Sequence, residues 1–207
     1  AEKIITRAIA AVLPDAAVER ALEGKTFLGR VYLVAAGKAA WQMAHAARAC
    51  LQDNFCGGVV VTKYGHVNGE IADVACFEGG HPVPDENSLR GTDAALALTE
   101  DLTESDTVVF LLSGGGSALF EKPLLPLAEL QDGTNQLLAA GADIVEINTI
   151  RKRLSAVKGG RFARHCAPAQ VFAVVLSDIL GDPLDMIASG PAYPDSSSCA
   201  QALDIAK

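Results

Sequence analysis

The sequence predicts an α/β protein, a three-layer α/β/α sandwich around a mainly parallel, Rossmann-like sheet. Short, wholly apolar runs alternate along the chain with longer segments in which apolar residues recur at helical spacing. A strand that is apolar at every position is buried on both faces, as happens when helices cover both sides of a parallel sheet. The chain has 207 residues, half of them hydrophobic, and is predicted to form one domain spanning residues 1–207.

Five segments have the apolar, β-branched character of strands. Four of them are strongly apolar, and the one that begins at Asp73 is weaker. We expect the strands that begin at Val31, Thr107 and Val171 to open into one crevice, because ligands bind beyond the carboxyl ends of open α/β sheets. In chain order, the predicted strands are Val31–Ala35, Gly58–Thr62, Asp73–Phe77, Thr107–Leu112 and Val171–Leu176.

Helices are predicted between these strands from helical periodicity and capping residues. Pro14 divides the N-terminal segment into two short helices, of which the second begins near Asp15. Asp85 can cap a helix that continues to about Leu102. Further helices are predicted at Ala39–Leu51, Leu127–Ala140, Asp143–Arg153, Gly160–His165 and from Ala200 onward, with residues 179–198 as a loop.

Composition and charge exclude several classes of protein. A chain with 50% hydrophobic and 20% charged residues is not intrinsically disordered. The net charge of −8 argues against nucleic-acid binding, which needs a basic surplus. No apolar run reaches the ~18 residues of a membrane span. The five cysteines form no CxxC pair, which favours free thiols in a reducing cytoplasm. The expected partner is a small molecule, and the chain is compatible with a homo-oligomer.

A glycine-rich turn follows the predicted strand Thr107–Leu112. Three consecutive glycines let the backbone adopt conformations that other residues cannot, and successive N–H groups can then point into one concavity and bind an anion. Flanking serines add hydroxyl donors, and the start of a following helix adds a positive dipole. The alternative is a tight turn without a ligand. The candidate anion-binding residues are Ser113, Gly114, Gly115, Gly116 and Ser117.

Lys38 lies at the end of another predicted strand, among small residues. A lysine at that position reaches the crevice and supplies a positive charge to a phosphate or a carboxylate. The segment is not a Walker A loop, because Tyr32 occupies the place of that motif's first glycine. The alternative is a solvated surface lysine.

Three aspartates follow the predicted strand Val171–Leu176: Asp178, Asp182 and Asp185. Asp178 and Asp182 can hold a hydrated Mg²⁺, which usually takes one or two protein carboxylates plus phosphate oxygens. Either carboxylate can instead act as a general base on a hydroxyl group. The alternative is a structural role, because aspartates also form turns and cap helices.

Residues 148–158 contain the main concentration of cations in this acidic chain. At helical spacing, Asn148, Arg151, Ser155 and Lys158 share one face. Such a polar stripe suits a carboxylate or phosphate ligand, and the alternative is a solvated helix face.

Two common motifs are missing from the sequence. Leu119 occupies the place of the third glycine of a GxGxxG dinucleotide fingerprint, and no GxSxG nucleophile elbow is present. The residues alone therefore predict an α/β protein with an anion-binding crevice and a magnesium site. Phosphoryl transfer is the chemistry that fits this combination best.

Six ordered segments resemble the glycerate 2-kinase family: AAGKAAWQMAHAA, TKYGH, EGGHPVPDENS, LLSGGGSAL, INTIRKRLSAVKGGRFA and LSDILGDPLDMIASGP. The resemblance runs from about residue 4 to residue 195. It implies ATP-dependent phosphorylation of D-glycerate to 2-phosphoglycerate with Mg²⁺. Because some relatives are labelled hydroxypyruvate reductase, NAD(P)H-dependent reduction is one alternative, and a non-catalytic sugar-acid binding module is another.

The resemblance also implies roles for particular residues. The lysine of the family's AxGKA element falls on Lys38, which is expected to neutralise phosphate charge. The family's glycine-rich loop falls on Ser113–Ala118, which is expected to hold a phosphate or the glycerate carboxylate. Its SDxxGD element includes Asp178 and Asp182, which are expected to hold Mg²⁺ or accept the hydroxyl proton.

The family's NxxRKxLSxxKGG element includes Asn148, Arg151 and Lys158, and the two cations are expected to orient the anionic substrate. The family pairs an N-terminal domain with a C-terminal MOFRL domain that closes the cleft. We therefore expect residues 1–207 to be the N-terminal domain of a longer enzyme, without its MOFRL domain and with negligible turnover alone.

Overall fold

The computed structural model describes residues 2–177 and 181–207 and confirms the predicted α/β class. Five parallel strands form one sheet in the order β3-β2-β1-β4-β5. Each predicted strand is present, and each boundary agrees to within a few residues. The strands are β1 (Val31–Ala36), β2 (Phe55–Lys63), β3 (Val74–Gly79), β4 (Thr107–Ser113) and β5 (Gln170–Leu176).

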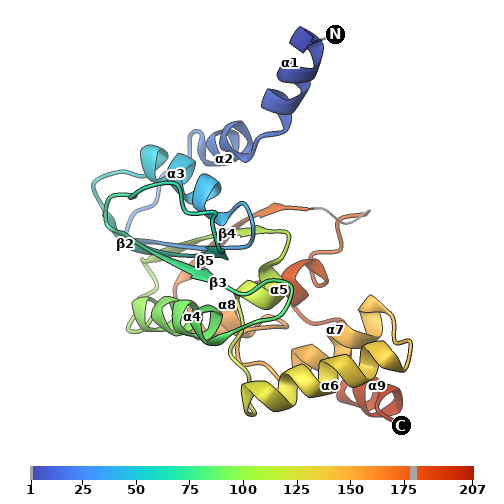
Figure 1. Cartoon of the computed structure of the whole chain (residues 1–207). Coiled ribbons are helices and arrows are strands. Elements are labelled where there is room, and N and C mark those ends of the chain that lie inside the picture. The colour runs from blue at the N-terminus through green and yellow to red at the C-terminus, as the bar shows by residue number, and fades with distance from the viewer. Residues whose placement is uncertain (1, 178–180) are drawn as a thin grey trace.

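Helices cover both faces of the sheet, so the molecule has three layers (Figure 1). Helices α2 and α3 pack on one face, and α4 and α8 pack on the other. Helices α6, α7 and α9 lie together beside the sheet, and α1 projects away from it (Figure 1). The helices are α1 (Glu2–Val12), α2 (Pro14–Leu22), α3 (Ala40–Cys50), α4 (Glu86–Leu98), α5 (Gly116–Leu119), α6 (Leu127–Ala139), α7 (Ile144–Arg153), α8 (Arg161–His165) and α9 (Cys199–Ile205).

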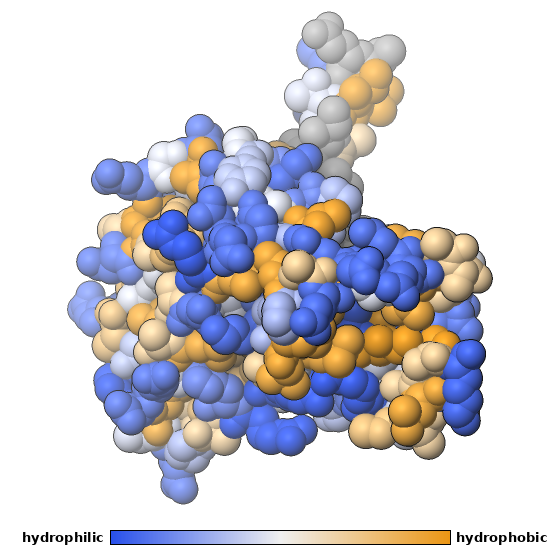
Figure 2. All heavy atoms as spheres, turned by 60° about the horizontal axis from the view of Figure 1, so that its bottom comes forward, coloured by the Kyte–Doolittle hydropathy of each residue, from blue (hydrophilic) through white to orange (hydrophobic). Residues whose placement is uncertain are grey.

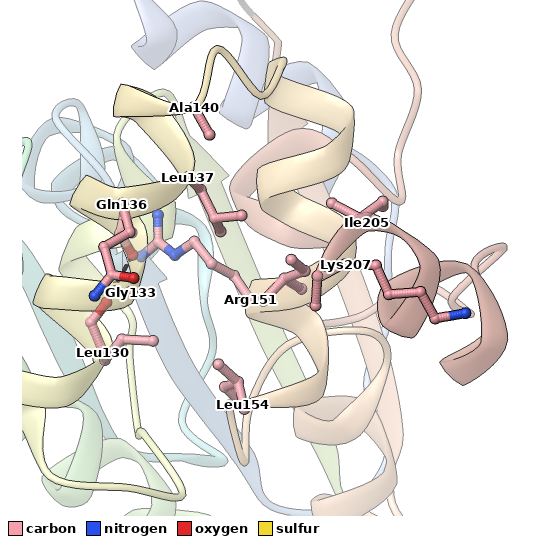
Figure 3. Close-up of a pocket in the computed structure, with 12 residues that line it drawn as sticks. Leu130, Gly133, Gln136, Leu137, Ala140, Arg151, Leu154, Ile205 and Lys207 are labelled. Atoms are coloured by element: carbon pink, nitrogen blue, oxygen red, sulfur yellow. Dashed lines mark hydrogen bonds between the residues drawn. The ribbon is translucent and has the colours of Figure 1, made fainter.

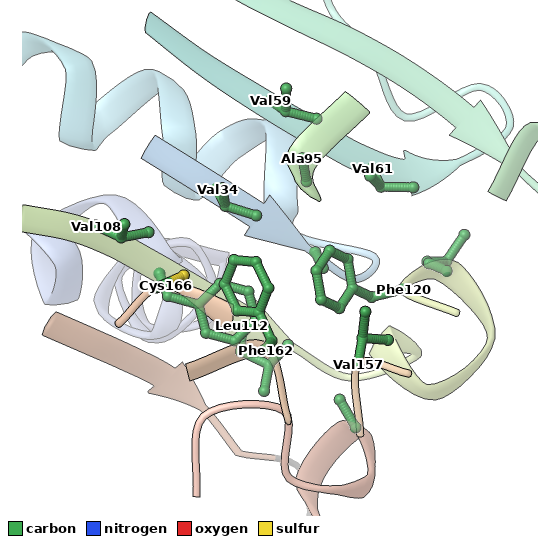
Figure 4. Packing of buried hydrophobic residues seen from close by; sticks show 14 of the residues in the cluster. Val34, Val59, Val61, Ala95, Val108, Leu112, Phe120, Val157, Phe162 and Cys166 are labelled. Carbon is green, nitrogen blue, oxygen red and sulfur yellow. The ribbon is translucent and has the colours of Figure 1, made fainter. Parts of the chain in front are cut away.

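The central strands β1 and β4 are buried along their whole length, whereas the edge strands β3 and β5 are only partly buried. This difference explains why the β3 segment is the weakest strand signal in the sequence. Between the sheet and the α4–α8 layer, the rings of Phe110, Phe120 and Phe162 lie with centroids 4.9 to 5.6 Å apart (Figure 4). This aromatic contact anchors the segment after the glycine turn to the sheet.

The strand order reverses between β1 and β4, since the chain leaves β1 for β2 on one side and reaches β4 on the other. In a parallel sheet, such a switch point leaves a crevice beyond the carboxyl ends of the two strands. Ala36 pairs with Leu112 at the last register position of β1. The segments that follow, Gly37-Lys38 and Ser113-Gly114, therefore start side by side.

Two predicted assignments need correction. The helix capped by Asp85 ends at Leu98 rather than near Leu102, because the Thr99 hydroxyl bonds back to the Ala95 carbonyl and closes the last turn. The loop predicted at 179–198 contains a 3-10 turn, η1 (Ile187–Ser189). In the described chain, no helix is long and apolar enough to cross a membrane.

The prediction that one helix face carries all of the polar stripe is wrong. Helix α7 ends at Arg153. Ser155 forms a bridge with Pro123, and the Ala156 amide donates to the Lys122 carbonyl at 2.7 Å. These tertiary bonds replace the helical ones, so Lys158 lies beyond the helix.

Candidate functional site

The Lys38 turn and the glycine turn are hydrogen-bonded to each other. The Lys38 amide donates to the Gly114 carbonyl at 2.8 Å, and the Ala39 amide donates to the Ser113 hydroxyl at 3.0 Å. Gly37 has φ +123°, and a β-carbon there would lie 2.3 Å from the Ser113 hydroxyl oxygen. The two turns can therefore approach this closely only with glycine at position 37. The structure thus places Lys38 beside the glycine turn, as the sequence predicts, whereas Asp178, the third member of the predicted crevice, lies outside the described residues.

The glycine turn presents unused donors next to Lys38. Gly115 has φ +87°, in the left-handed region that favours glycine. Among the described residues, the amides of Gly114 and Gly115 donate to no acceptor. The Lys38 side chain is exposed and forms no ion pair within the described chain. An anion at this turn would therefore meet free N–H groups and an uncompensated positive charge.

Two histidines border the same place, and sequence reasoning did not select either of them. His66 Nδ1 lies 2.8 Å from the Lys38 carbonyl oxygen. Because a carbonyl oxygen only accepts, His66 Nδ1 carries a hydrogen and donates it to Lys38. His81 lies against Gly115, and burial, with Lys38 as the next cause, lowers its pKa. His66 lies in the segment TKYGH and His81 in EGGHPVPDENS, and both segments resemble the glycerate 2-kinase family. Membership in these segments was the sequence signal that could have identified them as site residues.

An open hollow of about 620 Å³ extends from Lys38. Its walls are largely polar, and they include the Trp41 ring, which stacks on His45 with centroids 5.2 Å apart. Trp41 is fixed from its other end, since its Nε1 donates to the Gly69 carbonyl at 3.0 Å. The lining residues are Asp15, Lys38, Ala39, Trp41, Gln42, His45, His66 and Asn68. A polar ligand fits this hollow.

Arg151 and Lys158 meet at a buried carboxylate that the sequence did not reveal. Glu121 Oε2 lies 3.3 Å from Arg151 Nη2 and 3.3 Å from Lys158 Nζ, and both Glu121 and Lys158 are fully buried. Both cations also donate to the Ser117 carbonyl, at 2.9 and 2.8 Å, and Lys158 donates to the Phe120 carbonyl at 3.0 Å. We call Glu121, Arg151 and Lys158 the buried ion cluster.

The buried ion cluster binds two backbone carbonyls, those of Ser117 and Phe120, in the segment that follows the glycine turn. Burial lowers the pKa of Lys158 to about 8, although the charge of Glu121 opposes this shift. The Lys158 ammonium group has the Ser117 carbonyl, the Phe120 carbonyl and the Glu121 carboxylate as acceptors. In the described structure, Lys158 therefore supports the backbone of this segment. Direct contact of Arg151 and Lys158 with a substrate stays a prediction.

A chain of hydroxyl groups joins Asn148 to the same segment. The Ser189 hydroxyl donates to Asn148 Oδ1 at 2.9 Å, and it lies 2.9 Å from the Ser117 hydroxyl oxygen. Because the Ser189 hydrogen is used toward Asn148, Ser117 must donate to Ser189. The Ser117 hydroxyl is thus turned toward Ser189 in this structure, away from the role of anion donor that the sequence suggested. That Ser113 and Asn148 bind substrate stays a prediction.

The three predicted aspartates, Asp178, Asp182 and Asp185, have different surroundings or lie outside the described residues. Asp178 lies outside the described residues. Asp182 is exposed, with φ +49°, and forms no ion pair within the described part of the chain. Asp185 is engaged: its carboxylate lies 3.3 Å from Lys152 Nζ and accepts from the Ser196 hydroxyl. Residues 2–177 and 181–207 contain no group of three His, Cys, Asp or Glu suited to a metal ion.

A second hollow of about 430 Å³ lies between α6, α7 and α9, and its lining is mainly apolar (Figure 3). Figure 2 shows apolar side chains between charged ones on the face that contains these helices. Two cations line it: the buried ion cluster already holds the Arg151 guanidinium, and Lys207 pairs with Asp204 at 2.9 Å. The lining is unlike that expected for a phosphate or a small hydroxy acid. It includes Leu130, Leu137, Ile150, Leu154 and Ile205.

Comparisons with known proteins place the chain in a family. The family model described as a domain of unknown function, DUF4147, matches residues 1–207. A D-glycerate 2-kinase from Thermotoga maritima is 57% identical over 205 residues, which are 98% of this chain and 49% of that protein. A putative hydroxypyruvate reductase from Agrobacterium vitis is 40% identical over 98% of this chain and 46% of its own length.

A crystal structure of glycerate kinase from Thermotoga maritima superposes with a TM-score of 0.93 at 56% identity, covering 98% of this chain and 49% of that one. The chain thus spans about half the length of the relatives it matches. Sequence identity, family model and fold all agree with the resemblance read from the six segments. The chain belongs to the glycerate 2-kinase family.

Proposed function

We propose that this chain carries the phosphate-handling half of an ATP-dependent glycerate 2-kinase, which converts D-glycerate to 2-phosphoglycerate. One observation supports this above the others: Lys38 is hydrogen-bonded through its amide to the Gly114 carbonyl, beside glycine amides that have no acceptor in the described chain. Phosphoryl transfer needs mainly positioning and neutralisation of phosphate charge, and this arrangement supplies both.

In this proposal, the 2-hydroxyl oxygen of D-glycerate forms a bond to the γ-phosphorus as the bond between that phosphorus and ADP breaks. Lys38 neutralises charge on the transferred group. The glycine turn holds either a nucleotide phosphoryl or the glycerate carboxylate. The hydroxyl proton passes to a carboxylate, Asp178 or Asp182. The buried ion cluster keeps the glycine turn in place, and Arg151 and Lys158 complete the positive surroundings of the substrate.

Mg²⁺ is expected to accompany the nucleotide and to draw charge from its phosphates. It usually keeps several waters and takes one or two protein carboxylates, so Asp182, exposed and without a cation partner in the described chain, is chemically suited to it. Asp178 is the second candidate ligand. If this is correct, Asp182→Asn should raise the Mg²⁺ concentration needed for half-maximal activity, which a Mg²⁺ titration of the initial rate measures.

All five cysteines are free, which supports a reducing, cytoplasmic location. The substrate partner is a small hydroxy acid. A homo-oligomer, and the absence of nucleic-acid binding, stay predictions that light scattering and a gel-shift assay can test.

The decisive experiment uses the complete gene product with D-glycerate, ATP and Mg²⁺. ADP should form only when all three are present, and ³¹P NMR should identify 2-phosphoglycerate. The same protein should not oxidise NADH with hydroxypyruvate. NADH turnover clearly above a no-enzyme control would overturn the kinase proposal in favour of the reductase.

Glycerate binding without ADP formation by the complete protein would instead indicate a binding module. Residues 1–207 alone should show negligible turnover, because water is excluded only when the crevice has both walls. A rate within about tenfold of the complete protein, which is ~1.4 kcal/mol in the barrier, would contradict that expectation.

A further inference from the structure

His81 lies against the glycine turn although it follows the edge strand β3. A β-carbon on Gly115 would lie 2.9 Å from His81 Cδ2, 3.0 Å from His81 Nε2 and 3.1 Å from Lys38 Cγ. The imidazole edge and the stem of Lys38 therefore border the same glycine. Within the described residues, neither ring nitrogen of His81 has a hydrogen-bond partner.

The charged groups that act on His81 are positive and come from three places. Lys38 follows β1, Lys63 is the last residue of β2, and His66 follows β2. Burial, reinforced by these three groups, lowers the pKa of His81. The imidazole is therefore neutral near pH 7 and can donate one hydrogen bond without adding charge.

The carboxylates of the neighbouring elements are engaged elsewhere. Glu78, on β3, accepts from the His66 amide at 2.9 Å and from the Val67 amide at 2.8 Å. Asp85, which caps α4, accepts from the Tyr64 hydroxyl at 2.7 Å. Glu78 also acts on His66 electrostatically, whereas Lys38 and Lys63 have no ion-pair partner among the described side chains. An anionic ligand is what this arrangement lacks.

We propose that His81 binds the oxyanion held at the glycine turn, with its Nε2–H donating to the same carboxylate or phosphoryl group that Lys38 and the Gly114 and Gly115 amides contact. The identity of the oxyanion rests on the proposed function: it is the carboxylate of glycerate or a phosphoryl group of the nucleotide.

This contact has a consequence for protons. An anion beside an imidazole favours the charged ring, so ligand binding raises the pKa of His81 and draws a proton from solution. Affinity should therefore fall as pH rises from the lowered pKa of His81 in the free protein to its higher pKa in the complex.

Isothermal titration calorimetry of the complete protein tests the proposal, with inorganic phosphate, D-glycerate and ADP as three separate probes. Repeating each titration in buffers of different ionisation enthalpy gives the number of protons taken up. Wild-type protein should take up a fraction of a proton with at least one probe, and that probe identifies the oxyanion. His81→Leu should bind it at least about tenfold more weakly, because a charge-assisted hydrogen bond is lost.

His81→Gln separates the hydrogen bond from the proton. Its amide can replace the Nε2–H but cannot titrate, so affinity should stay within about threefold while proton uptake beyond that of the ligand itself disappears. His165→Gln is the matched control, because His165 is exposed and its Nε2 lies 3.0 Å from the Leu96 carbonyl. It should behave as wild type.

Three results would overturn the proposal: unchanged affinity in His81→Leu, unchanged proton uptake in His81→Gln, or no binding of any probe by the wild type. If His81→Leu does not fold, as judged by circular dichroism, the comparison of His81→Gln with the wild type still decides. The proposed function fails separately. A complete wild-type protein that forms no ADP overturns the kinase, whereas phosphate binding through His81 is measured without turnover.

Discussion

Two lysines that contact residues 113–121 play opposite roles. At the glycine turn, Lys38 is exposed and unpaired within the described chain. In the buried ion cluster, Lys158 is fully buried and shares Glu121 with Arg151. A charge without a partner is costly to bury and useful at a surface, where a ligand can neutralise it. A paired, buried charge holds backbone in place. The first lysine therefore serves the ligand, and the second serves the turn that meets it.

Removing the shared carboxylate should give the largest effect. Glu121→Gln leaves the fully buried Lys158 and the partly buried Arg151 without a counter-charge. Breaking a buried ion pair typically costs about 3–5 kcal/mol, so the free energy of unfolding should fall by about that amount. Urea denaturation measures it. Asp93→Asn is the matched control, because Asp93 pairs with Lys122 at 2.7 Å in an exposed ion pair. Its loss should be within ~1 kcal/mol. Similar losses in the two variants would contradict the contrast.

Lys38→Ala should affect activity and leave stability almost unchanged. Losing a preorganised electrostatic contact costs ~3–4 kcal/mol in the transition state, so kcat of the complete protein should fall by about 10²–10³. Unfolding should change by no more than about 0.5 kcal/mol, as for other exposed positions. Lys38→Arg should not restore kcat fully, because a planar guanidinium does not replace a compact ammonium.

Lys3→Ala, an exposed lysine on α1, is the control for Lys38 and should keep wild-type kcat. If Lys38→Ala kept more than about a third of wild-type kcat, less than 1 kcal/mol of barrier, Lys38 would be a surface lysine without a catalytic role.

The buried lysine should make stability depend on pH at the alkaline side. The pKa of Lys158 is about 8 in the folded chain against 10.5 in a free lysine. Between these values the unfolded chain binds more protons than the folded one, so stability increases as pH rises through that interval. Relative to Lys158→Met, the wild type should gain up to about 3 kcal/mol. Urea unfolding of both proteins at several pH values measures the difference, and a constant difference would refute it.

Gly115→Ala should give the smallest of these effects. An alanine with left-handed φ costs about 1–2 kcal/mol, and here its β-carbon would also press on His81 and Lys38. Gly24→Ala is the control, because Gly24 has φ +68° and nothing within 4 Å of its β-carbon position. Thermal unfolding should show the larger loss for Gly115→Ala. An equal loss would mean that the turn accommodates a methyl group, and that His81 is not held against it.

The sequence predicted the features that depend on residues close together in the chain, namely the strands and the turns that follow them. Strongly apolar runs identified four strands, and a weaker signal identified the strand that begins at Asp73. The meeting of Lys38 with the glycine turn followed from the rule that parallel strands end at one edge. Sequence reasoning missed Glu121, which lies 30 residues from Arg151 and has no local signal of burial. It also missed His81. This residue follows the edge strand β3, and only the path of the loop after β3 brings it next to Gly115. The polar stripe was misplaced because the bridge of Ser155 to Pro123 outcompetes helix propagation.

The strand order also has a consequence for biosynthesis. Of the five described strands, β1 is synthesised first and is the middle strand of the sheet, and each of the other four adds to an edge that already exists. Strands β2 and β3 extend one side, and β4 and β5 extend the other, so no strand has to insert between two paired ones. Domains fold as units during synthesis. The nascent chain therefore carries Lys38 on an unfinished edge until β4 emerges, and its ligand-binding turn is assembled only at that moment.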